Sequence, residues 1–150
     1  MSNISDLTTH MGYWLRLASN AVSQEFARKV TAEGVTVAEW ACMRSMYDED
    51  AMSPSALAEK MGMTKSAISK LADRLVEKSL IERTSNPDDK RGQSLRLTKE
   101  GRRKIPRLAK LADQNDAENF AVLTAKERAS LDRILRAFAE RHGLTGTPID

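Results

Sequence analysis

The sequence is poor in the residues and patterns that mark several large classes of protein. It has one cysteine, Cys42, and two histidines, so neither an intramolecular disulfide nor a Cys/His cluster for structural zinc can form. No apolar run approaches the roughly 20 residues that a membrane-spanning helix needs. The first residues also lack the basic and then apolar order of a signal peptide. We therefore expect a cytoplasmic protein with no structural metal and no membrane partner.

Patterns typical of enzymes are missing as well. The sequence has no glycine-rich phosphate loop and no Ser/His/Asp spacing of a hydrolase. The acidic triplet Asp48-Glu49-Asp50 is better interpreted as a loop between helices than as a catalytic carboxylate pair. We expect no enzymatic activity and no cofactor.

What the sequence does contain is a marked division of charge. Its 150 residues are 41% hydrophobic and 30% charged, a balance that fits one ordinary core. The net charge is only +3, but residues 60–110 hold 15 Lys and Arg against 6 Asp and Glu, a local +9, which leaves −6 on the rest of the chain. A basic middle of this kind favours contact with nucleic acid.

The spacing of apolar residues predicts long amphipathic helices at both ends of the chain. The first covers residues 5–32, and the last opens at the capping-box sequence Thr124-Ala-Lys-Glu127. Their apolar stripes are too wide for a small central unit to cover, so helices of a second copy are the simplest cover. The stripe residues are Leu7, Met11, Trp14, Leu15, Ala18, Val22 and Phe26 in the first helix, and Leu131, Ile134, Leu135 and Phe138 in the last.

Capping signals predict three shorter helices between them. Thr36-Val-Ala-Glu39 is a capping box that opens a helix to about Asp48. Ser53-Pro54 opens a short helix to Met61, which Gly62 closes. Thr64 caps a further helix to about Lys78, with Ile68, Leu71, Ala72 and Leu75 on its buried side.

A basic hairpin is expected after these helices. Two alternating runs, 80–84 and 94–97, pair naturally, with a polar tip at 87–93. A helix restarts at Thr98, and Pro106 within it should kink it because proline has no N–H and clashes with the preceding turn. Residues 143–150 are expected to be loosely ordered. The fold class is mainly α with a small β-hairpin wing, a winged helix-turn-helix flanked by dimerisation helices.

Two surfaces of this unit suit DNA. The positions of the Thr64–Lys78 helix that avoid the core are polar, and a helix of this kind fits a major groove, although a solvated face is the simpler alternative. At the hairpin tip an arginine can enter a minor groove while a neighbouring aspartate braces it; the alternative is a polar turn. The residues concerned are Lys65, Ser66, Ser69, Lys70, Asp73 and Arg74 on the helix, and Asp88, Asp89, Lys90 and Arg91 at the tip.

Residues 56–83, Asp89-Lys-Arg-Gly92 and Leu95-Arg-Leu-Thr-Lys-Glu-Gly101 together resemble the MarR family of bacterial transcription regulators. Asp89-Lys-Arg-Gly92 is similar to the Asp-x-Arg-Ser/Gly wing of that family. Pro106 departs from the pattern, as does Ser79, where many relatives carry glycine. The resemblance extends over nearly the whole chain, as one MarR-like domain over 1–150.

The resemblance implies a homodimer held by residues 5–32 and 102–143, with a DNA-binding region at 36–101. It also implies a pseudo-palindromic operator and a small, often aromatic or phenolic ligand that releases a repressor. The expected DNA-binding residues are Thr64, Lys65, Ser66, Ser69, Lys70, Arg74, Asp89, Lys90 and Arg91.

The best candidates for an effector site are residues with aromatic or cationic side chains in the first two helices. They are His10, Trp14, Trp40, Arg44 and Tyr47, because indole rings offer planar surfaces and Arg44 can pair with an anion. Core packing is the alternative for both tryptophans. Cys42 lies in a mostly apolar helix, and we expect it to pack there rather than sense oxidants.

A second class of function stays open at this stage. Winged folds also serve as protein-interaction modules, so an adaptor dimer without DNA binding is the alternative. The local +9 charge argues against it, because an adaptor needs no such excess on one helix and hairpin.

Overall fold

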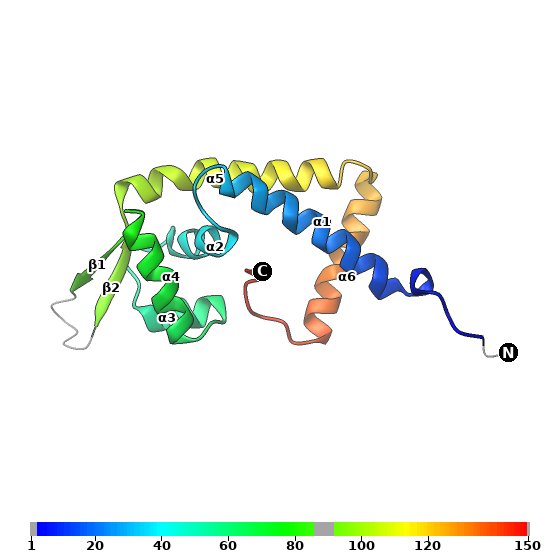
Figure 1. Cartoon of the computed structure of the whole chain (residues 1–150), viewed down its shortest axis with the longest axis horizontal. Helices are drawn as coiled ribbons and strands as arrows, with labels where there is room; N and C mark the ends of the chain where they lie inside the picture. The colour runs from blue at the N-terminus through cyan, green and yellow to red at the C-terminus, as the bar shows by residue number, and fades with distance from the viewer. Residues whose placement is uncertain (1–2, 86–91, 150) are drawn as a thin grey trace.

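The computed structural model describes residues 3–85 and 92–149. These residues form six α-helices, one short 3-10 turn and one hairpin (Figure 1). The elements are η1 (Leu7–Thr9), α1 (Met11–Thr31), α2 (Val37–Met46), α3 (Pro54–Met61), α4 (Lys65–Glu77), β1 (Ile81–Ser85), β2 (Gln93–Leu97), α5 (Lys99–Asn119) and α6 (Ala125–Arg141). The predicted fold class and element order are confirmed.

The helix starts that were predicted from capping residues are confirmed by those caps. Thr36 and Glu39 form the capping box at the start of α2, and Thr124 and Glu127 form the one at the start of α6. Thr64 accepts a hydrogen bond from the amide of Ala67 and caps α4. Because these residues satisfy amides that lack partners inside the helix, they fix where each helix begins.

The core lies where α2, α3, α4, the hairpin and the first half of α5 meet. As predicted, α4 buries one side, formed by Ile68, Leu71, Ala72 and Leu75. The hairpin is antiparallel, from Ile81 opposite Leu97 to Ser85 opposite Gln93. Met52 joins it through two backbone hydrogen bonds with Leu95, at 2.9 and 2.7 Å. These elements, from α2 to the first half of α5, share one hydrophobic core and are named here the winged unit; α4 lies on its surface.

Two backbone positions hold the hairpin against the helices. Ser79 joins α4 to β1 with a φ of 61°, in the left-handed region that favours glycine. Gly101 lies against Leu80, where a Cβ would sit 2.0 Å from the Leu80 carbonyl oxygen, so only glycine permits the contact. The wing therefore leaves the core at a fixed point.

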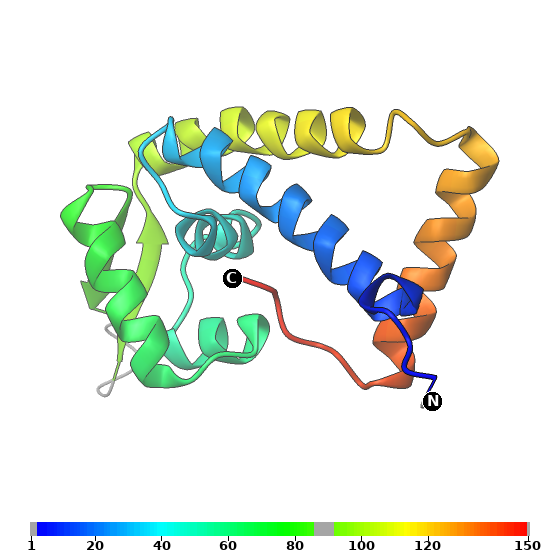
Figure 2. The same ribbon diagram turned by 45° about the vertical axis from the view of Figure 1, so that its right-hand side comes forward.

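Helices α1, α5 and α6 form an open frame beside this unit (Figures 1 and 2). Helix α1 packs along α5. At their crossing the buried Asn115 side chain donates to the Val22 carbonyl at 3.2 Å and accepts from Lys29 at 3.0 Å. The outer part of the frame is uncovered, and no residue of α6, a helix described in full, is buried. The predicted apolar stripe of α6 is therefore partly exposed to solvent; Phe138, for example, is 51% exposed.

The structure corrects two expectations, on the first helix and on the end of the chain, and bears on a third, on Pro106. The first helix starts at Met11 rather than near Ser5, because η1 and an extended His10 precede it. Pro106 lies inside α5, which stays helical from Lys99 to Asn119, so the proline does not end the helix; the kink expected there stays a prediction. The segment after α6 is not loosely attached, since it contacts α3 and the core.

None of the described helices is both long and apolar enough to cross a membrane.

Candidate nucleic-acid interface and adjoining cavity

The outward face of α4 is polar and open to solvent. The α3–α4 turn is set by Gly62, whose φ of 67° ends α3 in the left-handed conformation, and by Thr64, which caps α4 two residues later. Helix α4 therefore projects from the unit with its apolar side held in the core. All residues expected on its outward face are exposed, namely Lys65, Ser66, Ser69, Lys70, Asp73 and Arg74, and Thr64 at its start is exposed too.

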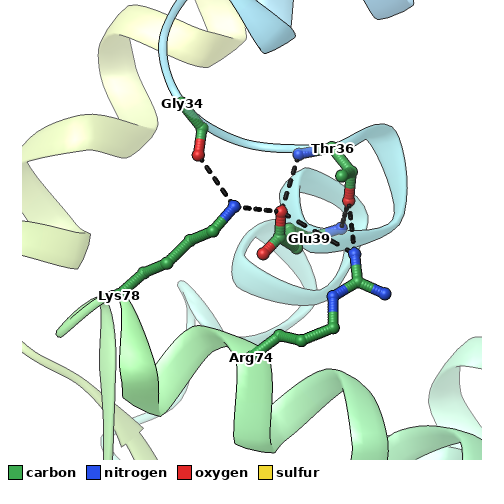
Figure 3. A network of polar contacts seen from close by, with 5 residues as sticks. All are labelled: Gly34, Thr36, Glu39, Arg74 and Lys78. Atoms are coloured by element: carbon green, nitrogen blue, oxygen red, sulfur yellow. Dashed lines mark hydrogen bonds and ion pairs between the residues drawn. The ribbon is translucent and has the colours of Figure 1, made fainter.

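Arg74 differs from the rest of this face because its side chain reaches back toward α2 (Figure 3). Its guanidinium donates to Thr36 Oγ1 at 3.2 Å and lies 3.8 Å from Glu39 Oε1. Arg74 therefore shares its helix with the outward-facing residues but points to the side of α4 on which a cavity lies.

Glu39 is the centre of the network drawn in Figure 3. The carboxylate is fully buried, and its Oε1 accepts from Lys78 Nζ and from the Thr36 amide, each at 2.8 Å. Lys78 also donates to the Gly34 carbonyl at 2.9 Å. The network joins the last turns of α4 to the start of α2, so it fixes the direction of α4.

The pKa of Glu39 lies below its ordinary value. Burial acts to raise it, but the hydrogen bonds from Lys78 and the Thr36 backbone, with the positive charge of Lys78, outweigh burial. Its second oxygen, Oε2, has no hydrogen-bond partner among the described residues. Glu39 is thus a charged group held in the core by its cationic neighbours.

The base of the wing is tied to α4. Arg83 on β1 forms an ion pair with Asp73 on α4, which places the start of the hairpin beside the outward face. The expected wing residues Asp89, Lys90 and Arg91, together with Asp88, lie outside the described residues. Their role stays a prediction.

A cavity of about 920 Å³ adjoins the network, between α1, α2 and the α3–α4 pair. The indole of Trp40 and the side chain of Phe26 supply apolar walls, and three cationic side chains and one carboxylate lie around them. The charged residues are Arg44, Lys60, Arg74 and Asp48. Large apolar walls with a few charged groups are typical of sites for small organic ligands.

The structure brings together only part of the expected effector site. Trp40 and Arg44 line the cavity, but His10, Trp14 and Tyr47 do not. Trp14 is 53% exposed on α1 and donates to the Thr8 carbonyl, which places it outside the core of this chain. The ring of Tyr47 instead lies close to two guanidinium groups, with the Cζ atoms of Arg44 and Arg102 at 5.6 and 5.8 Å from the ring centre.

Lys60 and Thr36 are two of the cavity residues that were not foreseen there. Lys60 donates to the Ser45 carbonyl at 2.6 Å and brings a positive charge to the mouth, but a lysine in the last turn of a helix gives no sequence signal beyond ordinary capping. Thr36 was identified as a cap, and the same hydroxyl also accepts from Arg74. Such second roles depend on the packing of α4 against α2.

Cys42 is packed in the core, as expected. Its side chain is fully buried, and burial, with the nearby charge of Glu39, raises the pKa of the thiol to about 12. Among the described residues no group of three His, Cys, Asp or Glu side chains is placed to hold a metal ion.

Comparison with known proteins agrees with this geometry. The family model described as MarR family matches residues 35–92, from the start of α2 to the wing. A Thauera aromatica protein named as a transcriptional regulatory protein for the hcr operon is 32% identical over 127 residues, which cover 84% of this chain and 76% of that protein. The multiple antibiotic resistance protein MarR of Escherichia coli is 30% identical over 103 residues, 68% of this chain and 72% of that protein. The chain belongs to the MarR family.

Solved structures of MarR-family regulators share its architecture. The PcaV transcriptional regulator from Streptomyces coelicolor, solved in complex with its natural ligand, superposes with a TM-score of 0.76 at 27% identity. The match covers 93% of this chain and 98% of that one, so it includes the outer helices as well as the winged unit. The curated relatives of this MarR-family chain are transcriptional regulators, a class of protein distinct from enzymes.

Proposed function

We propose that this chain is a sequence-specific DNA-binding regulator that places α4 in the major groove and its wing in the minor groove. The observation that carries the proposal is the outward face of α4, whose residues are exposed to solvent while the opposite side is buried in the core. A helix with a fixed inner side and a polar outer side is what groove recognition requires. As a regulator of transcription, it would act in the cytoplasm of a bacterial cell.

Different residues of this surface suit different contacts. Ser66, Ser69 and Lys70 project side chains able to donate to base edges, while Thr64 and Lys65, at the start of α4, lie where a phosphate gains from the helix N-terminus. From the wing, Arg91 would enter the minor groove, with Asp89 bracing it and Lys90 on the backbone. Arg74 would join them only by leaving Thr36.

The active form is proposed to be a homodimer. The outer frame exposes large apolar side chains that the winged unit does not cover, and extensive exposed apolar surface marks an interface. Two copies related by a twofold axis would place their α4 helices in successive major grooves about 10 base pairs apart, which explains a pseudo-palindromic operator. The residues concerned are Leu7, Met11, Trp14 and Leu15 before and within α1, and Ile134, Leu135 and Phe138 on α6.

The cavity is the proposed effector site of a repressor. Its aromatic wall and three cations suit a small aromatic anion, and PcaV shows a relative with a bound natural ligand. Arg74 belongs both to the cavity and to α4, so a bound anion that draws it away from Thr36 would change how α4 is held. A shifted α4 misaligns one half-site and releases the operator.

Titration of a fluorescent duplex at several salt concentrations tests DNA binding. The duplex should carry DNA from upstream of the gene for this chain. We expect the slope of log affinity against log salt to shrink in the double variant Lys65→Ala/Lys70→Ala and to stay unchanged in Lys126→Ala, an exposed lysine on α6. Equal slopes for all three proteins, or no binding at any salt concentration, would favour the adaptor alternative.

A further inference from the structure

The segment that follows α6 turns back toward the cavity. Figures 1 and 2 show it running from the end of α6 to the space between α2 and α3. Residues 144–149, named here the return segment, belong to no helix or strand. Leu144 at its start is 68% exposed, whereas Thr147, Pro148 and Ile149 line the cavity, whose other lining residues lie within 23–74. One wall of the cavity therefore comes from a distant part of the chain.

The return segment is anchored at the end of α3. Met61 is the last residue of α3, and its carbonyl is one of those left without a partner inside the helix. The Thr147 amide donates to this carbonyl at 3.2 Å. Next to it, a Cβ on Gly62 would lie 2.9 Å from the Cα of Gly146, so the close approach of the two backbones requires glycine at position 62. The end of α3 thus sets where the segment meets the cavity.

The last turn of α3 also brings a positive charge to the cavity. Lys60 lines it and is the residue before Met61. The wall residues Thr147, Pro148 and Ile149 carry no charge, and Ile149 is half-buried and packs against the core of the winged unit. An aromatic carboxylate needs a cation for its charge and apolar side chains for its ring. The α3 end and the segment attached to it supply both.

We propose that the return segment is a specificity-determining wall of the effector site, where the ring of a bound aromatic anion packs against Pro148 and Ile149. The proposal rests on the proposed function for the identity of the cavity as the effector site. The cavity has a volume of about 920 Å³ with the segment in place, near the upper end of the range of roughly 300–1,000 Å³ for such sites. Ligand and segment therefore fit the cavity together.

The same wall links the ligand to the outer frame. Helix α6 is joined to α5 near its start by the ion pair between Arg128 and Asp116, and its other end continues into the return segment. A segment that improves ligand binding is itself held in place more firmly by the ligand, by the same factor. A bound ligand therefore ties the far end of α6 to α3, and with it the outer frame to the winged unit.

Titration with 2-naphthoate, an aromatic carboxylate, tests the wall in full-length variants. The nuclear magnetic resonance signal of the Trp40 indole N–H reports the cavity, because Trp40 lines it. Ile149→Ala removes most of one wall side chain, and Ile4→Ala makes the same change at a residue that is 81% exposed and does not line the cavity.

We expect Ile149→Ala to raise the Kd of 2-naphthoate at least about fivefold, because a ligand loses apolar contact with the deleted carbons, and Ile4→Ala to match the parent. Equal Kd values for all three proteins would overturn the proposal. So would a Trp40 signal that does not respond to 2-naphthoate in the parent.

Amide hydrogen exchange tells a wall from a segment that the ligand expels or ignores. The Thr147 amide reports the seated segment through its hydrogen bond to Met61, and the Leu144 amide, which donates to the Ala139 carbonyl at 2.9 Å, is the control outside the cavity. We expect saturating 2-naphthoate to slow exchange at Thr147 at least about fivefold and to leave Leu144 unchanged. Faster or unchanged exchange at Thr147 would overturn the proposal.

Duplex binding separates this proposal from the function on which it rests. A parent protein that binds no duplex, while the titration and exchange results hold, would refute the proposed function and leave the return segment as the wall of a small-molecule site. Duplex binding that 2-naphthoate weakens, with the same Kd for 2-naphthoate in Ile149→Ala and the parent, would support the proposed function and overturn the wall.

Discussion

Replacement of Glu39 by glutamine tests the network that directs α4. Glutamine keeps the Oε1 acceptor for the Thr36 amide but loses the charge that faces Lys78. Hydrogen bonds between charged groups contribute about 1.5–3 kcal/mol, and Lys78 is 41% exposed, so we expect a loss near the middle of that range, about 2 kcal/mol. For a chain of this length that loss lowers Tm by roughly 4–8 °C.

The assay is thermal unfolding at one fixed protein concentration, because a dimer makes Tm depend on concentration. Glu127→Gln is the matched control: Glu127 occupies the same place in the capping box of α6, but it is exposed and has no cationic partner among the described residues. We expect it to change Tm much less. Equal shifts for the two variants would show that the loss comes from the cap alone and would refute the role of Lys78.

The effect of Glu39→Gln should also depend on pH. The pKa of Glu39 in the folded state lies below the ordinary value of 4.5, so the carboxylate stabilises the protein fully above that pH. The stabilisation is lost as the pH falls through the folded pKa. The difference in unfolding free energy between parent and variant should therefore be constant near neutrality and shrink below about pH 4.5.

Four further results are expected. Arg91→Ala should weaken operator binding by about 1 kcal/mol or more at matched salt without changing the dimer, measured by anisotropy and sedimentation; equal affinity would count against the wing. Lys70→Ala should relax base preference if Lys70 meets a base, or reduce the salt slope if it meets a phosphate; unchanged values of both would remove it from the interface. Leu135→Asp should shift sedimentation toward the monomer, and an unaltered dimer would place the interface elsewhere. Ser79→Gly should raise the unfolding free energy by about 0.5–1 kcal/mol because the φ of 61° suits glycine; a lower value would mean that the Ser79 backbone is not strained.

Local signals in the sequence were sufficient for the winged unit. Thr36, Ser53 and Thr64 were identified as helix caps from residue type alone, and each accepts the expected amide. The buried and outward sides of α4 followed from helical spacing, because the core contacts only one side of it. Where a residue's role depends on its nearest neighbours in sequence, the sequence predicted it.

Roles that depend on contacts between distant segments were not predictable in the same way. Glu39 was identified as a cap, but its burial against Lys78 arises from the packing of α2 on α4. Arg74 was placed with the outward face by spacing, although its long side chain reaches Thr36. Residues 144–149 are too few for a helical or strand pattern, and the hydrogen bond from the Thr147 amide to the Met61 carbonyl exists only because α3 ends beside them.

The effector site shows the same limit. Trp40 and Arg44 were expected there and line the cavity, while His10 and Trp14 lie on the outer frame. Helical spacing placed Trp14 on an apolar stripe, and nothing in that spacing distinguishes a core from a surface that a second copy covers. The contribution of His10 and Trp14 to an effector site stays a prediction for the dimer.

Footprinting of the bound protein on DNA is the measurement that tests the central claim most directly. The account predicts two protected half-sites on one face of the duplex, with centres about 10 base pairs apart, and loss of both in a variant that no longer dimerises. Protection of a single site, or protection spread evenly along the fragment, would contradict it.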